Sequence, residues 1–155
     1  MVDLKKRIWI FPLISIIFSI LSLSLPVAYR EHATYNSYFW LSALNLRTDT
    51  GALWYNSDPL AITGAVLEIL VIVIAMILLL FSVIRIYQDK LSEKLAKLNF
   101  LVSGLLLILS PLGYIILANL YVSDFWSIYI PFFGIISPFI AAGISILTIF
   151  LYKRE

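Results

Sequence analysis

The sequence of 155 residues contains no cysteine and a single histidine, His32. The absence of cysteine excludes disulfides, thiol catalysis and cysteine-ligated metals, and one histidine cannot form a paired-imidazole site. Charged residues are also scarce, at 13%, whereas 62% of the residues are hydrophobic. A soluble domain is typically about 25% charged and about 45–50% apolar. The composition therefore excludes an ordinary soluble enzyme and predicts a single integral membrane domain over 1–155.

Four apolar runs are long enough to cross a membrane, because a spanning helix needs about 20 mostly apolar residues. The runs cover 8–27, about 60–84, 100–120 and 130–151, and they predict helices over about 8–27, 60–87, 92–121 and 130–152, with one long outer loop over 28–59. Their length and uniformly apolar character exclude strands. The sequence thus predicts an all-α membrane protein built as a bundle of four transmembrane helices.

The distribution of basic residues predicts the orientation of this bundle. Nine of the eleven basic residues lie before the first run, between the second and third runs, or after the fourth, and only Arg30 and Arg47 lie elsewhere. By the positive-inside rule, both termini are expected in the cytoplasm. The chain is expected to be a multi-pass protein of the plasma membrane. Membrane lipids are expected partners. Nucleic acid is not an expected partner, because no folded domain outside the membrane presents the basic residues. The nine residues are Lys5, Lys6, Arg7, Arg85, Lys90, Lys94, Lys97, Lys153 and Arg154.

Small residues recur at helical spacing in every run. Helix contacts in a membrane depend on small residues that allow close approach, because lipid tails are as apolar as leucine. Pro111 and Pro138 lie inside the third and fourth runs, where each removes a backbone hydrogen bond. The carbonyl groups that they free need other donors. The positions expected at helix contacts include Gly64, Gly113, Gly134 and Ala141.

Glu68 is the one ionisable residue within an apolar run, which makes it a candidate functional residue. At 1.5 Å per residue it lies about 12 Å below the outer end of its helix. Ser19, Tyr114 and Ser137 have similar depths, so these four residues are predicted to form one polar layer. Two interpretations stay open. A protonated Glu68 donates a hydrogen bond that stabilises the bundle, or Glu68 carries a proton or cation across the membrane.

The outer loop over 28–59 is rich in aromatic residues, which favours short strands. Strands are predicted over 38–44 and 52–55, and the segment 47–51, RTDTG, is typical of a turn. A small extracellular β-hairpin is therefore expected on the outer mouth of the bundle. Trp40 and Trp54 lie on either side of this turn.

Four helices with a long first outer loop, Trp40, and the segment 51–57, GALWYNS, resemble the claudin and peripheral myelin protein superfamily. That family carries a tryptophan, a Gly-Leu-Trp-like segment and then a cysteine pair in this loop. Ser57 stands where the first cysteine would fall, so the pair is absent here. The resemblance implies a left-handed four-helix bundle capped by a small extracellular sheet, with Trp40, Leu53 and Trp54 anchoring the loop.

The resemblance also implies a non-enzymatic role in self-association, adhesion or barrier formation, or as an auxiliary subunit. The sequence contains no evident nucleophile–base pair or metal cluster, so we expect no enzyme, no cofactor and no metal. The predicted partner is a second copy of the chain or another integral membrane protein. Two alternatives stay open, an accessory structural subunit of a larger membrane enzyme or respiratory complex, and a small proton or ion transporter that uses Glu68.

Overall fold

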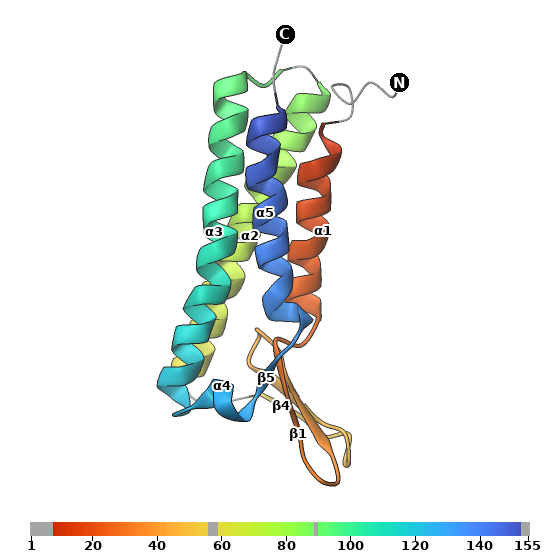
Figure 1. Ribbon diagram of the computed structural model, residues 1–155, viewed down its shortest axis with the longest axis vertical. Coiled ribbons are helices and arrows are strands. Elements are labelled where there is room, and N and C mark those ends of the chain that lie inside the picture. Colours follow the sequence, from red (N-terminus) through yellow and green to blue (C-terminus); the bar gives the residue numbers. More distant parts are fainter. Residues whose placement is uncertain (1–7, 56–58, 89, 153–155) are drawn as a thin grey trace.

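The computed structural model describes residues 8–55, 59–88 and 90–152 (Figure 1). Lys5, Lys6, Arg7, Lys153 and Arg154, on which part of the predicted orientation rests, lie outside these residues, as does Ser57. Within the described ranges the elements, in chain order, are α1 (Ile10–Ser24), β1 (Ala28–Glu31), β2 (Asn36–Phe39), β3 (Leu44–Arg47), β4 (Leu53–Tyr55), α2 (Pro59–Tyr87), α3 (Glu93–Tyr121), α4 (Phe125–Ile128), β5 (Ile130–Pro131) and α5 (Phe133–Leu151).

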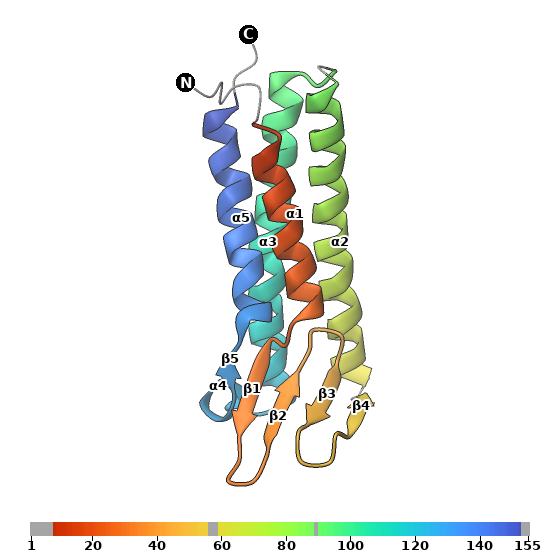
Figure 2. The ribbon, with the colours of Figure 1, turned by 90° about the vertical axis from the view of Figure 1, so that its right-hand side faces the viewer.

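The helices α1, α2, α3 and α5 lie side by side in an elongated bundle, with the sheet at one end (Figures 1 and 2). The start of α1, the end of α5 and the connection between α2 and α3 lie at the opposite end. Around the bundle, α2 packs against α3, α3 against α5, and α5 against α1, while a smaller contact between α1 and α2 closes the ring. Fully buried side chains between the helices include Ile72, Leu79, Phe100 and Leu107.

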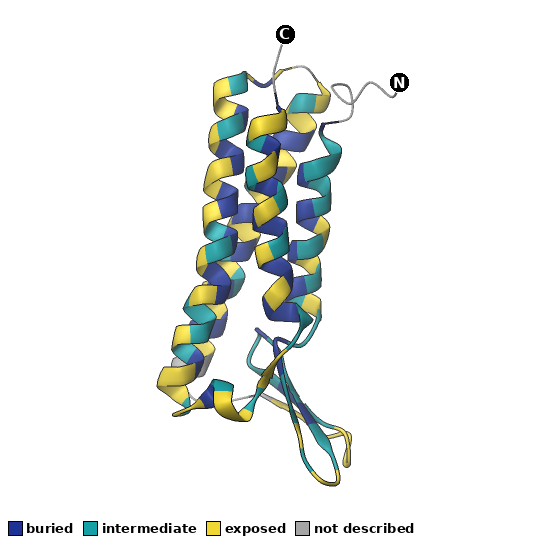
Figure 3. Ribbon diagram, in the orientation of Figure 1, coloured by how far each residue is buried: buried dark blue, intermediate teal, exposed yellow. Residues whose placement is uncertain are grey.

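Three of the helices are long and apolar enough to cross a membrane, namely residues 62–87 of α2, together with α3 and α5. The outward faces of the bundle are exposed in the isolated chain (Figure 3), and they carry large apolar side chains such as Ile77 and Leu109. Apolar outer faces of this kind suit contact with lipid tails. The helices therefore indicate a membrane-embedded protein. α1 has 15 residues, fewer than the roughly 20 of a full span.

The first and fourth apolar runs form shorter helices than the sequence predicts, and both differences have a local cause. α1 ends at Ser24 because Pro26 disfavours a helical conformation in the residue before it, and Leu25 is extended with ψ of 153°. α5 starts at Phe133 rather than near residue 130, because Ile130 and Pro131 pair with β1. The bounds of α2 and α3 lie within one residue of the predicted ones.

Buried polar side chains join neighbouring helices. The Ser15 hydroxyl donates to the carbonyl of Ala141 at 3.0 Å, which joins α1 to α5. The Ser145 hydroxyl donates to the carbonyl of Phe100 at 2.8 Å, which joins α5 to α3. Between α3 and α2, the Asn99 amide donates to the Ser82 hydroxyl at 3.0 Å. Because lipid offers no alternative partner, such bonds favour one arrangement of the helices over others.

The proline inside α5 frees a backbone carbonyl, and α1 supplies its donor. Pro138 has no N–H, so the carbonyl of Gly134, four residues earlier, lacks its helical partner. The Ser22 hydroxyl of α1 donates to that carbonyl at 2.8 Å, and the Ser137 hydroxyl lies 3.4 Å from it. The sequence predicts that a freed carbonyl needs a donor, and at Pro138 this prediction is confirmed.

The sheet has five antiparallel strands in the order β4-β3-β2-β1-β5, so both segments at this end of the bundle contribute to one sheet (Figure 2). The sequence predicts only a hairpin. The predicted strand over 38–44 is wrong in its centre, because residues 40–43 form the turn between β2 and β3, with Ala43 at φ of 60°. The Trp40 N–H donates to the Leu44 carbonyl at 2.9 Å across this turn.

Two turn residues of the sheet have left-handed backbones, Gly51 at φ of 63° and Ala43 at φ of 60°. Such a backbone costs an L-residue roughly 1–2 kcal/mol, and glycine adopts it freely. We therefore expect Gly51→Ala to lower the melting temperature through a loss of about 1–2 kcal/mol, and Ala43→Gly to raise it through a gain of less than about 1 kcal/mol, because glycine also has more freedom to lose on folding. Melting of the two variants in one detergent tests this, and shifts of the same sign would contradict it.

Candidate functional site

A cavity of about 350 Å³ lies between the sheet and the neighbouring ends of α2 and α3, with α4 on its side. Seven of its fifteen lining residues are aromatic, and they come from the sheet, from α3 and from the segment that follows α3. The remaining residues are mainly small or aliphatic, among them Gly64 and Ala65 of α2. We call this cavity the aromatic chamber. Its aromatic residues are Phe39, Trp40, Trp54, Tyr114, Tyr121, Phe125 and Tyr129.

The sheet is attached to the bundle through the turn between β2 and β3. The Trp40 indole N–H donates to the carbonyl of Ser24, at the end of α1, at 3.0 Å. Leu41 is 3% exposed, although nothing in the sequence marks it as an anchor. Of the predicted anchors, Trp40 thus contacts the bundle and Trp54 lines the chamber. Leu53 is 60% exposed, so its prediction as an anchor is wrong.

The segment after α3 forms one wall of the chamber. Asp124 has a left-handed backbone, with φ of 59°, which turns the chain into α4. Phe125 then stacks on Tyr129, with ring centroids 4.4 Å apart, and Tyr129 meets Phe39 of the sheet at 4.6 Å. The Trp126 indole donates to the carbonyl of Ile115 at 3.1 Å, which fixes α4 to α3. The sequence does not predict this wall, because its rings come from segments that are far apart in the chain.

Glu68 is not itself a lining residue of the chamber, but it lies on α2 near two residues that are. It follows Gly64 and Ala65 by about one helical turn on the same face of α2 and is only 6% exposed. Its Oε1 atom lies against Gly113 of α3, where a side chain would have no space, and Ser110 of α3 lies beside the carboxyl group. Neither Glu68 Oε2 nor the Ser110 hydroxyl finds a hydrogen-bond partner of ordinary geometry within the described residues.

The predicted polar layer forms only in part. Tyr114 lies close enough to Glu68 for an electrostatic interaction, so these two residues do meet at the interface of α2 and α3. Ser19 and Ser137 are buried, but their hydroxyls donate to Ser15 and Gly134 carbonyls of their own helices. No hydrogen bond joins either serine to Glu68 in the described part of the chain. The depth calculation therefore identifies a pair rather than a layer of four.

The four predicted contact positions all lie where helices approach closely. A Cβ at Gly64 would stand 3.1 Å from Leu117 of α3, and Gly113 faces Glu68. A Cβ at Gly134 would stand 2.5 Å from the backbone oxygens of the segment after α1. Ala141 is fully buried, and its carbonyl accepts the bond from α1.

The exposed tip of the sheet carries an ion pair. The Arg47 guanidinium lies 2.8 Å from one carboxylate oxygen of Asp49 and 3.3 Å from the other, and it stacks 4.1 Å from the ring centroid of Tyr35. The hydrogen bonds from Arg47 hold the pKa of Asp49 below its usual value, and they raise the pKa of Arg47 in turn. This pair joins the end of β3 to the turn before β4, so it helps to fix that edge of the sheet.

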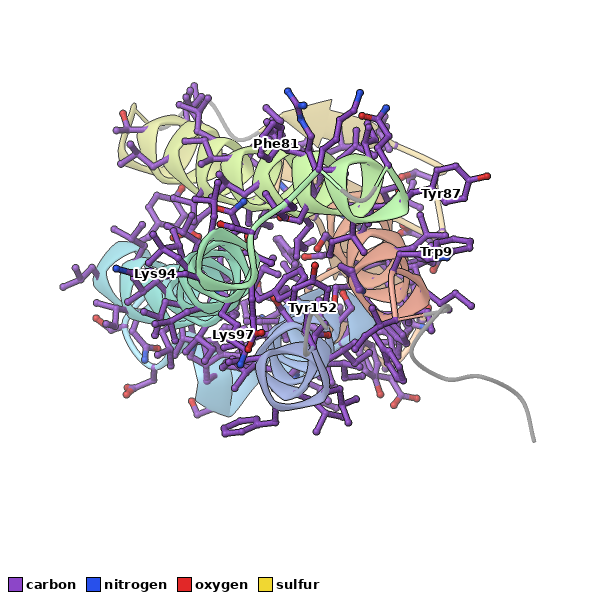
Figure 4. The ribbon with its side chains drawn as sticks, turned by 90° about the horizontal axis from the view of Figure 1, so that it is seen from above. Trp9, Phe81, Tyr87, Lys94, Lys97 and Tyr152 are labelled. Carbon is purple, nitrogen blue, oxygen red and sulfur yellow. The ribbon has the colours of Figure 1, made fainter. Side chains whose placement is uncertain are left out.

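The end of the bundle opposite the sheet is closed by packed side chains (Figure 4). Tyr152 is 7% exposed and packs edge-on against Phe100, with ring centroids 6.1 Å apart. Trp9 and Tyr87 form a similar pair at the rim, also at 6.1 Å. The Lys97 ammonium pairs with Glu93 at 2.6 Å one turn along α3. The aromatic chamber therefore lies at the sheet end, far from this closed end.

Comparisons with protein-family models, with curated proteins and with solved structures find no match to this chain. Within the described ranges, no group of three His, Asp or Glu side chains is placed to hold a metal ion. Two features of the described structure are candidates for a functional role. One is the aromatic chamber together with the nearby Glu68, and the other is the exposed edge of the sheet at β4.

Proposed function

We propose that this chain is a non-enzymatic integral membrane protein that acts through contacts with other protein molecules, as its resemblance to the claudin superfamily implies. The observation that carries the proposal is the open edge of the sheet at β4. Leu53 on this strand is 60% exposed, and Trp54, which also lines the aromatic chamber, is 40% exposed. An edge strand that presents apolar side chains and unpaired backbone groups is a template for pairing with another chain.

The structure of this edge supports the proposal. β4 stands last in the strand order and has β3 as its only strand neighbour among the described elements. The pairs Leu46↔Leu53 and Asn45↔Trp54 fix its register. The Arg47–Asp49 pair also joins the end of β3 to the turn before β4, which favours one conformation of this edge in the free chain. Such preorganisation reduces the entropy lost on binding.

The distribution of charge favours an outward-facing sheet. Lys90, Lys94 and Lys97 lie at the end of the bundle opposite the sheet. By the positive-inside rule that end belongs in the cytoplasm, so the sheet would lie on the outer face of the cell membrane. We propose α1 as a fourth span. Its 15 residues cover about 22 Å, and local bilayer thinning or the interfacial residue Trp9 can accommodate the difference.

The other expected functions have different support. An accessory subunit would use the same edge or the apolar outer faces, so the experiment below separates it from self-association. A proton path through Glu68 has less support, because the fully buried Ile72 and Leu79 follow it along α2. Such a path needs a chain of titratable or hydrated groups.

Disulfide cross-linking in native membranes tests the proposal, because the natural chain has no cysteine. We expect Leu53→Cys to give an adduct of fixed mass under mild oxidation. Ile130→Cys is the matched control, since Ile130 is 49% exposed on the opposite edge. β5 has only two residues, and its Pro131 offers no N–H for pairing. We therefore expect several-fold less product from the control.

The mass of the adduct distinguishes the two forms of the proposal. A disulfide needs a thiol on each partner. A product of twice the chain mass therefore supports self-association, and a product with one cysteine-bearing membrane protein, identified by mass spectrometry, supports the accessory role. Equal product from both variants would overturn the role of the β4 edge, and no product from Leu53→Cys in membranes where the protein is folded would overturn self-association through this edge.

A further inference from the structure

Aromatic rings from three parts of the chain line the aromatic chamber. Trp40 and Trp54 enter from the sheet, Tyr114 and Tyr121 from α3, and Tyr129 from the segment after α4. The negative faces of aromatic rings attract cations within about 6 Å, most strongly when water is excluded. Arg30 already lies 5.8 Å from the ring centroid of Tyr129. The wall residues thus include a ring that already contacts a cationic side chain, although Arg30 itself does not line the chamber.

An acid lies one helical turn beyond the α2 residues that line the chamber, and one of its two oxygens has no partner in the described part of the chain. Glu68 is only 6% exposed, and its Oε2 atom has no hydrogen-bond partner among the described residues. The Ser110 hydroxyl beside it is also buried and unpartnered. A buried carboxylate requires an opposite charge or several hydrogen bonds. The described chain supplies neither, although Tyr114, which lines the chamber, lies within electrostatic reach of the carboxyl group.

The region below Glu68 is closed, which indicates a binding site rather than a passage. Ile72 and Leu79 of α2 and Leu107 of α3 are fully buried between Glu68 and the Ser82–Asn99 pair at the other end. Phe100 and Tyr152 close that end. These side chains close the route from Glu68 toward the opposite end of the bundle, and the chamber lies on the other side of Glu68, at the sheet end.

We propose that the aromatic chamber binds a small organic ammonium ion, with its positive charge toward Glu68 and its alkyl groups against the rings. A hydrated metal ion would need several oxygen ligands, and the lining offers mainly ring and aliphatic carbon. An alkylammonium ion suits both a carboxylate and aromatic faces. The volume of about 350 Å³ lies at the lower end of ligand sites, which favours a small ligand.

The same chemistry could come from a free amine or from the choline headgroup of a lipid. Both place a substituted ammonium group in the chamber and differ only in what is attached to it. The chamber lies at the end of the helices, where headgroups lie if the helices span the membrane. The experiment therefore includes one arm with a choline lipid and one without.

Tryptophan fluorescence of the full chain tests the proposal, because Trp40 and Trp54 line the chamber. The probes are choline and its uncharged isostere 3,3-dimethylbutan-1-ol, added to protein in phosphatidylglycerol nanodiscs. We expect a saturable change with choline, and binding of the isostere at least about tenfold weaker. Replacing phosphatidylglycerol by phosphatidylcholine suppresses the choline response if the headgroup is the occupant and leaves it unchanged if the ligand is free.

Glu68→Gln should weaken choline binding to the level of the isostere, because glutamine keeps the shape and removes the charge. Glu93→Gln, at the other end of α3, is the matched control and should leave binding unchanged. If Glu68→Gln does not fold, the comparison of choline with its isostere on the natural chain still decides the question. Equal binding of the two probes, or no saturable response in phosphatidylglycerol, would overturn the proposal. This result is independent of cross-linking at β4.

Discussion

Gly134→Ala is expected to destabilise the protein by about 1–3 kcal/mol, whereas Gly143→Ala in the same helix is expected to stabilise it by up to about 1 kcal/mol. A Cβ at Gly134 would stand 2.5 Å from the backbone oxygens of both Leu25 and Pro26, and nothing lies within 4 Å at Gly143. Backbone oxygens cannot rotate away as a side chain can. The sheet-side ends of α1 and α5 would therefore have to separate.

Separation of these ends would also weaken two hydrogen bonds. The Gly134 N–H donates to the Pro26 carbonyl at 2.8 Å, and the Ser22 hydroxyl donates to the Gly134 carbonyl at the same distance. Thermal or denaturant unfolding of the two alanine variants in one detergent measures the difference. Similar stabilities for both variants would show that the structure accommodates a methyl group at position 134 without loss of unfolding free energy.

Ser22→Ala is the second change with a large expected effect, a loss of about 1–3 kcal/mol. The reason is the carbonyl of Gly134, which Pro138 deprives of its helical donor. Without Ser22, its remaining donor is the Ser137 hydroxyl at 3.4 Å. Ser24→Ala is the control, because Ser24 is exposed and bonds to Ile20 within its own helix. We expect the control to change stability by less than about 0.5 kcal/mol.

A double-mutant cycle with Pro138→Ala isolates this interaction. Alanine at 138 restores an N–H that can donate to the Gly134 carbonyl, so the carbonyl no longer depends on α1. Ser22→Ala should then cost about 1 kcal/mol less in the Pro138→Ala background than in the natural chain. An equal cost in both backgrounds would mean that Ser22 contributes through packing rather than through this bond.

The sequence predicts the long helices well, because their bounds depend on local signals. Ser92 caps α3 by accepting from the Leu95 N–H at 3.4 Å, and the apolar runs of α2 and α3 are continuous. The small residues at helix contacts are predictable for the same reason, since their spacing places them on one face. Predictions fail where the chain meets a distant segment, as at β5, which takes residues from the predicted fourth helix.

The sheet is underpredicted because β1 and β2, with sequences AYRE and NSYF, lack a clear alternation of apolar and polar residues. They are strands because β1 lies between β2 and β5, a pairing that spans about a hundred residues of sequence. No local pattern encodes such a neighbour.

The sequence predicts how deep each residue of the candidate site lies in the bundle, but not which neighbouring helix its side chain faces. Glu68 and Tyr114 meet because α2 and α3 are neighbours, whereas the hydroxyls of Ser19 and Ser137 bond within α1 and α5. Counting residues gives each depth, but the order of helices around the ring is a tertiary property. The aromatic chamber depends on that order of helices and on the folded sheet. The sequence therefore shows that the aromatic residues are present, but it does not predict that they line one cavity.

The bond between Ser15 and Ala141 joins residues that are 126 positions apart. At a synthesis rate of about 5–20 residues per second, α1 emerges from the ribosome about 6–25 s before its main partner, α5. During that interval the buried serines of α1 have only the smaller contact with α2 to shield them from lipid. The first helix to be made is therefore among the last to complete its packing, and the newly made chain depends on α1 staying in place until translation ends.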